Sequence, residues 1–217
     1  HLSTIADYIL SHNRIIQTRV DDSVVRVFNN RQMLIRRSRG YAPSPVLLKG
    51  DLISDIPVLA CGPELKNTFC MTKGQKAFLS QHIGDLENMA VNNAYKNSID
   101  LFKRLFTIKP KLIACDMHPE YFSTKFAKSY AQDNDLPLVQ VQHHHAHIAS
   151  VMAEHDLKGD VIGVSLDGTG FGDDGHIWGG EFFIANLSGY ERRGHFQYMP
   201  LPSGAKAVKE PWRLGLW

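Results

Sequence analysis

The order of short apolar segments and amphipathic segments constrains the fold more than any other feature of this sequence. Three short strands are predicted close together, and predicted helices and strands alternate after them. The predicted strands are 58–61, 68–72, 77–81, 112–115, 138–141, 161–166, 177–187 and 194–198, and the predicted helices are 85–106, 121–132 and 143–154. An antiparallel start followed by alternating helices and strands indicates an α/β domain, not a helical bundle or a β-sandwich.

The first 46 residues differ in charge from the rest. They carry seven arginines, no lysine and three acidic residues, whereas residues 47–217 carry 17 basic and 19 acidic residues. Residues 40–45 contain a glycine and two prolines, a composition typical of a linker. We therefore predict two parts, 1–46 and 47–217.

The first part is too small to fold alone. A short helical pattern at Ile5, Tyr8 and Ile9 is followed by two predicted strands, 23–28 and 33–37, around a turn. A hairpin and one helical turn do not bury a core. We expect this part to be the α+β tail of a domain that begins upstream.

Composition excludes several classes of protein. No apolar run reaches the roughly 18–20 residues of a membrane-spanning helix. The net charge is only +2, so the composition does not indicate a nucleic-acid partner. Cys61, Cys70 and Cys115 show no C-x-x-C spacing, which disfavours a structural zinc site and is typical of buried free thiols in a reducing cytoplasm.

Four histidines gather at the predicted start of the helix 143–154. His143 and His147 are four residues apart, so their side chains share one helix face with Cβ atoms about 5–6 Å apart. Two neutral imidazoles at this spacing can bind one divalent metal ion. Because two ligands do not complete a site, a third must come from elsewhere in the protein. The alternative is a set of surface or hydrogen-bonded helix histidines.

A glycine-rich turn, Asp167-Gly168-Thr169-Gly170-Phe171-Gly172, follows the predicted strand 161–166. Glycines let the backbone approach phosphate, Asp167 can hold Mg²⁺ or a water, and Thr169 can donate to a phosphate oxygen. Hairpins also use such residues. Placed between two strands, however, the turn resembles the phosphate-binding turn of the actin-like ATPase superfamily, and it matches neither a Walker A loop nor a Rossmann fingerprint.

Lys66 is the natural anion contact in a second turn, 62–68, which lies between the first two strands of the α/β part. In an actin-like fold the other phosphate loop occupies such a hairpin. The alternative is a solvated lysine of a surface turn.

Four further residues are weaker candidates. His82 and Asp85 lie at a predicted strand-to-helix junction, where capping by Asp85 is the alternative to a substrate contact. His118 follows the predicted strand 112–115, at the ligand-facing end expected of an open α/β sheet. Glu181 is expected to be an exposed strand residue.

Seven segments together resemble the HypF family of carbamoyltransferases, which are hydrogenase maturation proteins. They are DDSV at 21–24, RRSRGYAP at 36–43, LKNTFC at 65–70, SQHIGDLEN at 80–88, CDMHP at 115–119, VQHHHAH at 141–147 and DGTG at 167–170. The histidine run is the most specific of them. The resemblance implies that residues 1–46 end a YrdC-like domain. It also implies that residues 47–217 form the first half of a TsaD-like domain, an α/β half-domain of the actin-like ATPase superfamily.

The resemblance also implies a reaction. In this family the YrdC-like domain makes carbamoyl adenylate from carbamoyl phosphate and ATP. The TsaD-like domain then transfers the carbamoyl group to the C-terminal cysteine of HypE, for the cyanide ligand of [NiFe] hydrogenase. Carried over, His143 and His147 bind a divalent metal, Fe or Zn. The nucleotide, with Mg²⁺, faces Asp167, Gly168, Thr169 and Gly170, and less securely Lys66.

Parts of the family pattern are missing from these residues. They include the acylphosphatase-like and zinc-finger regions, most of the YrdC-like domain, and an aspartate expected to complete the metal site. We therefore expect the 217 residues alone to bind metal weakly and to make no carbamoyl adenylate. Two alternatives stay open: a TsaD-type tRNA threonylcarbamoyl transferase, and a non-enzymatic metal- or nucleotide-binding module.

Overall fold

A computed structural model describes residues 2–168, 170–202 and 204–216. Its centre is a six-stranded sheet of order β3-β6-β5-β4-β7-β8. The strands are β3 Val46–Leu47, β4 Val58–Ala60, β5 Cys70–Lys73, β6 Lys76–Leu79, β7 Leu112–Asp116 and β8 Leu138–Val141. β4, β5 and β6 pair antiparallel, whereas β4 pairs with β7 and β7 with β8 in parallel. The α/β prediction, with its antiparallel start, is confirmed.

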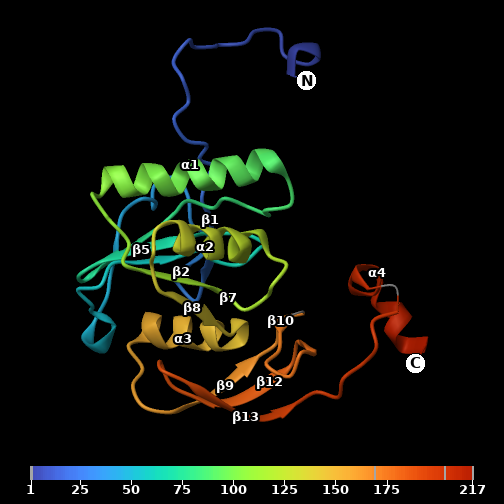
Figure 1. Ribbon diagram of the computed structural model, residues 1–217. Coiled ribbons are helices and arrows are strands. Elements are labelled where there is room, and N and C mark those ends of the chain that lie inside the picture. The colour runs from blue at the N-terminus through green and yellow to red at the C-terminus, as the bar shows by residue number, and fades with distance from the viewer. Residues whose placement is uncertain (1, 169, 203, 217) are drawn as a thin grey trace.

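Two helices cover one face of this sheet, α1 (Met89–Leu105) and α2 (Phe122–Asp133) (Figure 1). Their buried side chains form one core with the central strands, in which Tyr95 and Ile99 of α1 pack with Leu59 and Ile113. The predicted first helix begins later than expected because Asn88, not Asp85, is its N-cap, accepting a hydrogen bond from the Val91 N–H at 3.0 Å.

The third helix, α3 (His143–His155), lies between the six-stranded sheet and a smaller sheet (Figure 1). The smaller sheet has the order β13-β12-β9 and is antiparallel. Its strands are β9 Val161–Ser165, β12 Glu181–Ala185 and β13 Tyr190–His195, and the ribbon β10 Gly170–Phe171 with β11 Ile177–Trp178 follows β9. Ile148 and Met152 of α3 form a second core with Trp178, Phe183 and Ala185.

Several predicted segments of this half are placed differently. The predicted strand 177–187 is interrupted at Gly179 and Gly180, which separate β11 from β12. The predicted strand 194–198 is wrong, since β13 ends at His195. Beyond it, α4 (Ala205–Lys209) and a 3₁₀ helix, Pro211–Leu216, complete the described chain.

The first part forms the predicted hairpin of β1 (Val24–Phe28) and β2 (Arg31–Arg36). The helical pattern predicted at Ile5, Tyr8 and Ile9 is wrong. These side chains are exposed, and among the described residues of this part only Leu2–Thr4 is helical. The boundary predicted between residues 46 and 47 falls within β3, and it stays a prediction. No helix in the described ranges has both the length and the apolar character needed to cross a membrane.

Candidate metal centre

The geometry of the histidine run is set by the start of α3. Gln142 is the N-cap, and its side-chain oxygen accepts a hydrogen bond from the His145 N–H at 2.9 Å. The helix therefore begins at His143, and His147 follows one turn later on the same face, as the i,i+4 spacing predicts. β8 leads directly into this cap, which fixes the first helical turn at the edge of the six-stranded sheet.

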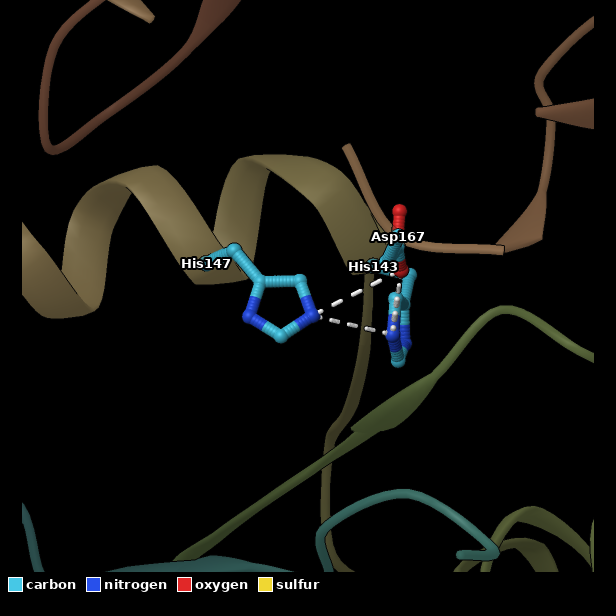
Figure 2. A group of neighbouring side chains, drawn as sticks. All are labelled: His143, His147 and Asp167. Atoms are coloured by element: carbon cyan, nitrogen blue, oxygen red, sulfur yellow. Dashed lines mark hydrogen bonds and ion pairs between the residues drawn. The ribbon is translucent and has the colours of Figure 1, made fainter. Parts of the chain in front are cut away.

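Asp167 joins these two histidines. It follows β9, and its Oδ2 atom lies 3.2 Å from Nε2 of His143 and 3.6 Å from Nε2 of His147 (Figure 2). The two Nε2 atoms are themselves 3.2 Å apart. We call His143, His147 and Asp167 the metal cluster. Asp167, which the sequence assigned to the nucleotide, thus offers a third donor atom within this chain, and the aspartate expected from outside it stays a prediction.

The donor set suits a divalent ion. Ligands bound at about 2.0–2.1 Å in tetrahedral geometry stand roughly 3.3 Å from one another, close to the distances within the metal cluster. All three donor atoms lie within 4.8 Å of one another. Two imidazoles and one carboxylate are ligands typical of zinc in catalytic sites and of non-haem iron.

The charges around His143 favour a cation there. Hydrogen bonds to Asp116 and Asp167 raise the pKa of His143 to about 9, although its burial opposes the shift. Burial by itself would raise the pKa of Asp167, but contacts with His143, His144 and His147 hold that pKa well below its ordinary value. Asp167 therefore stays ionised, and without an ion the protonated His143 ring carries the positive charge between the two carboxylates; a bound divalent ion takes the place of the proton on Nε2.

The two other histidines of the run are buried. His144 is inaccessible to solvent, and its Nε2 atom lies 2.5 Å from Oδ1 of Asp167, the oxygen that faces away from the metal cluster. Its Nδ1 atom lies 3.1 Å from the side-chain nitrogen of Gln142. Nε2 of His145 lies 2.8 Å from the carbonyl oxygen of Asn186. His144 thus supports a ligand, and His145 joins α3 to the small sheet.

The sequence placed Asp116 in a run at the ligand-facing end of a strand but assigned it no role, and the structure shows that it contacts His143. It ends β7, and its Oδ2 atom is 2.7 Å from Nδ1 of His143. The strand pairing explains the contact: β7 and β8 are parallel neighbours, so the residue ending one strand lies beside the helix that follows the other.

The backbone of Gly168 faces a second feature, a cleft of about 600 Å³ that is also lined by Asp167, Gly179, Gly180 and Glu181. A Cβ atom at Gly179 would lie 2.8 Å from the carbonyl oxygens of residues 167 and 168, so glycine permits this close approach. Thr169, predicted to contact phosphate, lies outside the described residues.

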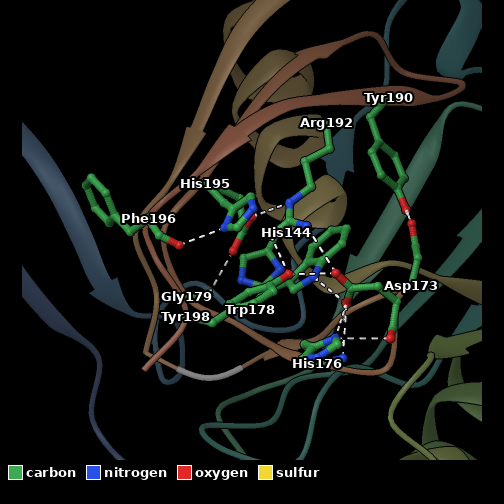
Figure 3. A network of polar contacts seen from close by, with 12 residues as sticks. His144, Asp173, His176, Trp178, Gly179, Tyr190, Arg192, His195, Phe196 and Tyr198 are labelled. Carbon is green, nitrogen blue, oxygen red and sulfur yellow. Dashed lines mark hydrogen bonds and ion pairs between the residues drawn. The ribbon is translucent and has the colours of Figure 1, made fainter. Parts of the chain in front are cut away.

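Glu181 is buried, not exposed as expected. Its Oε2 atom accepts from Nε of Arg192 at 2.6 Å, and Oε1 accepts from the Gly179 N–H at 3.2 Å; Figure 3 labels Arg192 and Gly179. Arg192 also stacks on Trp178, 4.2 Å from the ring centroid. The charge is satisfied within the fold, which gives Glu181 a structural role at the wall of the cleft.

Comparisons with known proteins identify the family of this chain. The family model of the HypF Kae1-like domain matches residues 54–154. The model of the second subdomain of the carbamoyltransferase Kae1-like domain matches residues 163–217. Carbamoyltransferase HypF2 of Cupriavidus necator is 46% identical over 216 residues, 98% of this chain and 26% of the relative. The chain belongs to the HypF carbamoyltransferase family.

Other HypF proteins support the assignment. HypF of Rhizobium leguminosarum bv. viciae is 44% identical over 99% of this chain and 27% of its own length. A crystal structure of full-length HypF in a phosphate- and nucleotide-bound form superposes with a TM-score of 0.89 at 50% identity, over 98% of this chain and 33% of that one. The chain therefore spans about a quarter of the length of these curated HypF relatives.

Of the weaker candidates, His118 is linked to the metal cluster through Asp116. Lys66 is exposed, and its backbone N–H donates to Oδ1 of Asp85 at 2.7 Å, so Asp85 holds a turn and does not cap a helix. His82 is half-buried, and burial lowers its pKa. The His118 ring stacks on Tyr121 at 4.0 Å, and its backbone N–H donates to Asp116.

Proposed function

We propose that this chain provides the metal-binding part of a carbamoyltransferase that acts in hydrogenase maturation. The observation that carries the proposal is the convergence of His143, His147 and Asp167 at distances suited to one divalent ion, in a chain of the HypF family. The metal is Fe²⁺ or Zn²⁺ on the chemistry of the donors. When bound, it supplies a Lewis acid that polarises a carbonyl oxygen.

The nucleotide belongs on the cleft side of Asp167. Gly168 exposes backbone there with no atom within 4 Å of a Cβ position, and Gly170 follows in β10. A glycine-rich turn of this kind gives phosphate oxygens access to backbone N–H groups. We assign ATP-derived carbamoyl adenylate with Mg²⁺ to this side, next to the metal cluster. Lys66 stays a predicted anion contact from the neighbouring part of the fold.

The chain's own residues then have distinct tasks in the transfer. His143 and His147 would hold the ion through Nε2, and Asp167 through Oδ2, while His144 contacts its other oxygen. The acceptor is the thiolate of the C-terminal cysteine of HypE, which attacks the carbamoyl carbon. A C–S bond forms, the bond from that carbon to the adenylate phosphate oxygen breaks, and AMP leaves into the cleft. Because carbamoyl phosphate and ATP are cytoplasmic metabolites, we infer a cytoplasmic location, and we expect neither nucleic acid nor membrane as a partner.

The test uses a full-length HypF relative in which the 216 matching residues are replaced by this sequence. Transfer of radiolabelled carbamoyl from carbamoyl phosphate to HypE is expected, and His143→Ala or His147→Ala should lower it by about 100-fold or more. Lys66→Ala tests the separate assignment of Lys66 as an anion contact. A loss confined to nucleotide affinity supports that assignment. Undiminished transfer in the double histidine variant contradicts the proposal.

Two outcomes favour the alternatives. Threonylcarbamoylation of tRNA adenosine by the same protein, with no transfer to HypE, would indicate the TsaD-type reaction. Retained HypE binding with no transfer in any form would indicate a binding module.

The 217 residues alone are expected to release no pyrophosphate from ATP and carbamoyl phosphate, so full turnover by them contradicts the division into partial domains.

A further inference from the structure

Asp116 contacts a metal-cluster histidine without belonging to the cluster. It is the last residue of β7, and its side chain is only 6% exposed. The carbonyl oxygen of Asp116 accepts from the Thr124 hydroxyl at 3.1 Å, which ties the end of the strand to α2. The core of the α/β domain therefore fixes both the backbone and the side chain of Asp116.

Both carboxylate oxygens of Asp116 have defined partners. Oδ2 is 2.7 Å from Nδ1 of His143, and Oδ1 accepts from the His118 backbone N–H at 2.8 Å. An ionised carboxylate only accepts, so Nδ1 of His143 must carry a proton. Nε2 points toward His147 and Asp167, and it is the nitrogen that gives up its proton when an ion binds.

We propose that Asp116 is the positioning residue of the metal centre. It fixes the ring plane and the tautomer of His143, so that Nε2 is presented to the ion before the ion binds. Ligating histidines whose second nitrogen is held by a carboxylate are oriented and made more basic in this way. The inference rests on the proposed metal cluster but assigns a residue outside it.

The two histidines are not equivalent in this respect. His143 is 18% exposed and held between Asp116 and Asp167, whereas His147 is 56% exposed. Among the described residues, no carboxylate faces Nδ1 of His147. His143 is therefore the preorganised ligand, and His147 completes the site from a freer position.

Asp116→Asn removes the positioning while keeping the size of the side chain. An amide has one oxygen, but two N–H donors, from His143 and His118, point at this side chain. The amide NH₂ must face one of them, and facing His143 it favours the tautomer with the proton on Nε2. Zn²⁺ affinity of the 217-residue chain, measured by competition with a chelating dye, should fall 10- to 100-fold.

The matched control is Asp133→Asn, an equal change of charge at the exposed end of α2, which should leave Zn²⁺ affinity unchanged. If Asp116→Asn does not fold, as judged by circular dichroism, nitrogen NMR of the Zn²⁺-loaded wild-type chain decides. His143 should show a protonated Nδ1 and a ligating Nε2, and ligation through Nδ1 overturns the inference.

The outcomes separate this inference from the proposed function. Wild-type affinity in a folded Asp116→Asn variant, with His143→Ala still impaired, overturns the role of Asp116 alone. Absence of Zn²⁺ binding by the wild-type chain, or binding that His143→Ala and His147→Ala leave intact, overturns the metal cluster and this inference with it.

Discussion

The carboxylate of Asp116 accepts a hydrogen bond from the ring of His143 across 2.7 Å, which joins the end of β7 to the first turn of α3. The contact exists because β7 and β8 are parallel neighbours and α3 starts directly after β8. The metal cluster is thus assembled by sheet topology, with donors that are 20 residues apart along the chain (His147 and Asp167) and a support 27 residues before His143.

Gly170→Ala is expected to destabilise the chain and disturb Asp167. A Cβ atom at Gly170 would lie 2.2 Å from Cε1 of His144, which is fully buried and contacts Asp167. Overpacking of this kind costs about 1–3 kcal/mol. Urea unfolding measures the loss, and Gly189→Ala is the control because its Cβ atom meets nothing within 4 Å. Equal stability of the two variants contradicts the tight contact with His144.

Arg192→Ala should lower the free energy of unfolding far more than Arg193→Ala does. Removing Arg192 leaves the buried Glu181 carboxylate without its 2.6 Å partner, and such losses typically cost 3–5 kcal/mol, an order-of-magnitude figure. Within the described part of the chain Arg193 pairs with Glu191 alone, and both side chains are more than half exposed, so Arg193→Ala should cost less than about 1 kcal/mol. Thermal or urea unfolding compares the pair, and similar losses would contradict the buried ion pair.

Asp174 should contribute stability that disappears in acid. Burial alone would raise its pKa, but hydrogen bonds from Tyr198, His176 and Trp178 and the charge of Arg192 hold the pKa well below the ordinary value of 3.8. A depressed folded-state pKa stabilises the fold above the unfolded pKa and loses that stability as pH falls through the folded value. The wild-type chain should therefore lose more stability between pH 6 and pH 3 than Asp174→Asn.

The control for this pH effect is Asp133→Asn at the end of α2, which should follow the wild-type curve. Urea midpoints at several pH values give the comparison. A constant difference between wild type and Asp174→Asn across the range would show that the network of Figure 3 does not perturb the Asp174 carboxyl.

The three thiols should be unreactive in the folded chain. Burial raises the pKa of Cys61 and Cys70 to about 12 and that of Cys115 to about 11. Since the thiolate is the nucleophile, a disulfide reagent at pH 8 should react at least about 100-fold more slowly than with free cysteine. All three should react at once in urea. Fast labelling of Cys61 or Cys115 in the native chain would contradict the burial of these two thiols.

Local patterns predicted much of the fold. β8 and the start of α3 were placed correctly because an apolar strand ends at Val141 and Gln142 caps the helix that follows. The β1–β2 hairpin followed from its turn at Asn29 and Asn30, which both have positive φ. Strand β13 was misplaced because its YERRGH sequence has alternating burial but few apolar residues, and Arg192 is held by charge and stacking.

The site was only partly accessible from sequence. The His143–His147 pair follows from helical spacing alone, since both residues belong to one helix. The place of Asp167 does not, because it depends on how β9 is brought back against α3. The same holds for Asp116 and for Glu181, whose burial depends on an arginine from the adjacent strand. Sequence spacing therefore identified ligands within one element, and tertiary packing supplied the rest.

The most direct test of the metal cluster is a Co²⁺ titration followed by visible absorption. The wild-type chain should bind one ion with the d–d spectrum of mixed nitrogen and oxygen ligands, and Zn²⁺ should displace it. His143→Ala/His147→Ala should abolish the spectrum, and Asp167→Asn should weaken binding. An unchanged spectrum and affinity in the double histidine variant would contradict the metal centre.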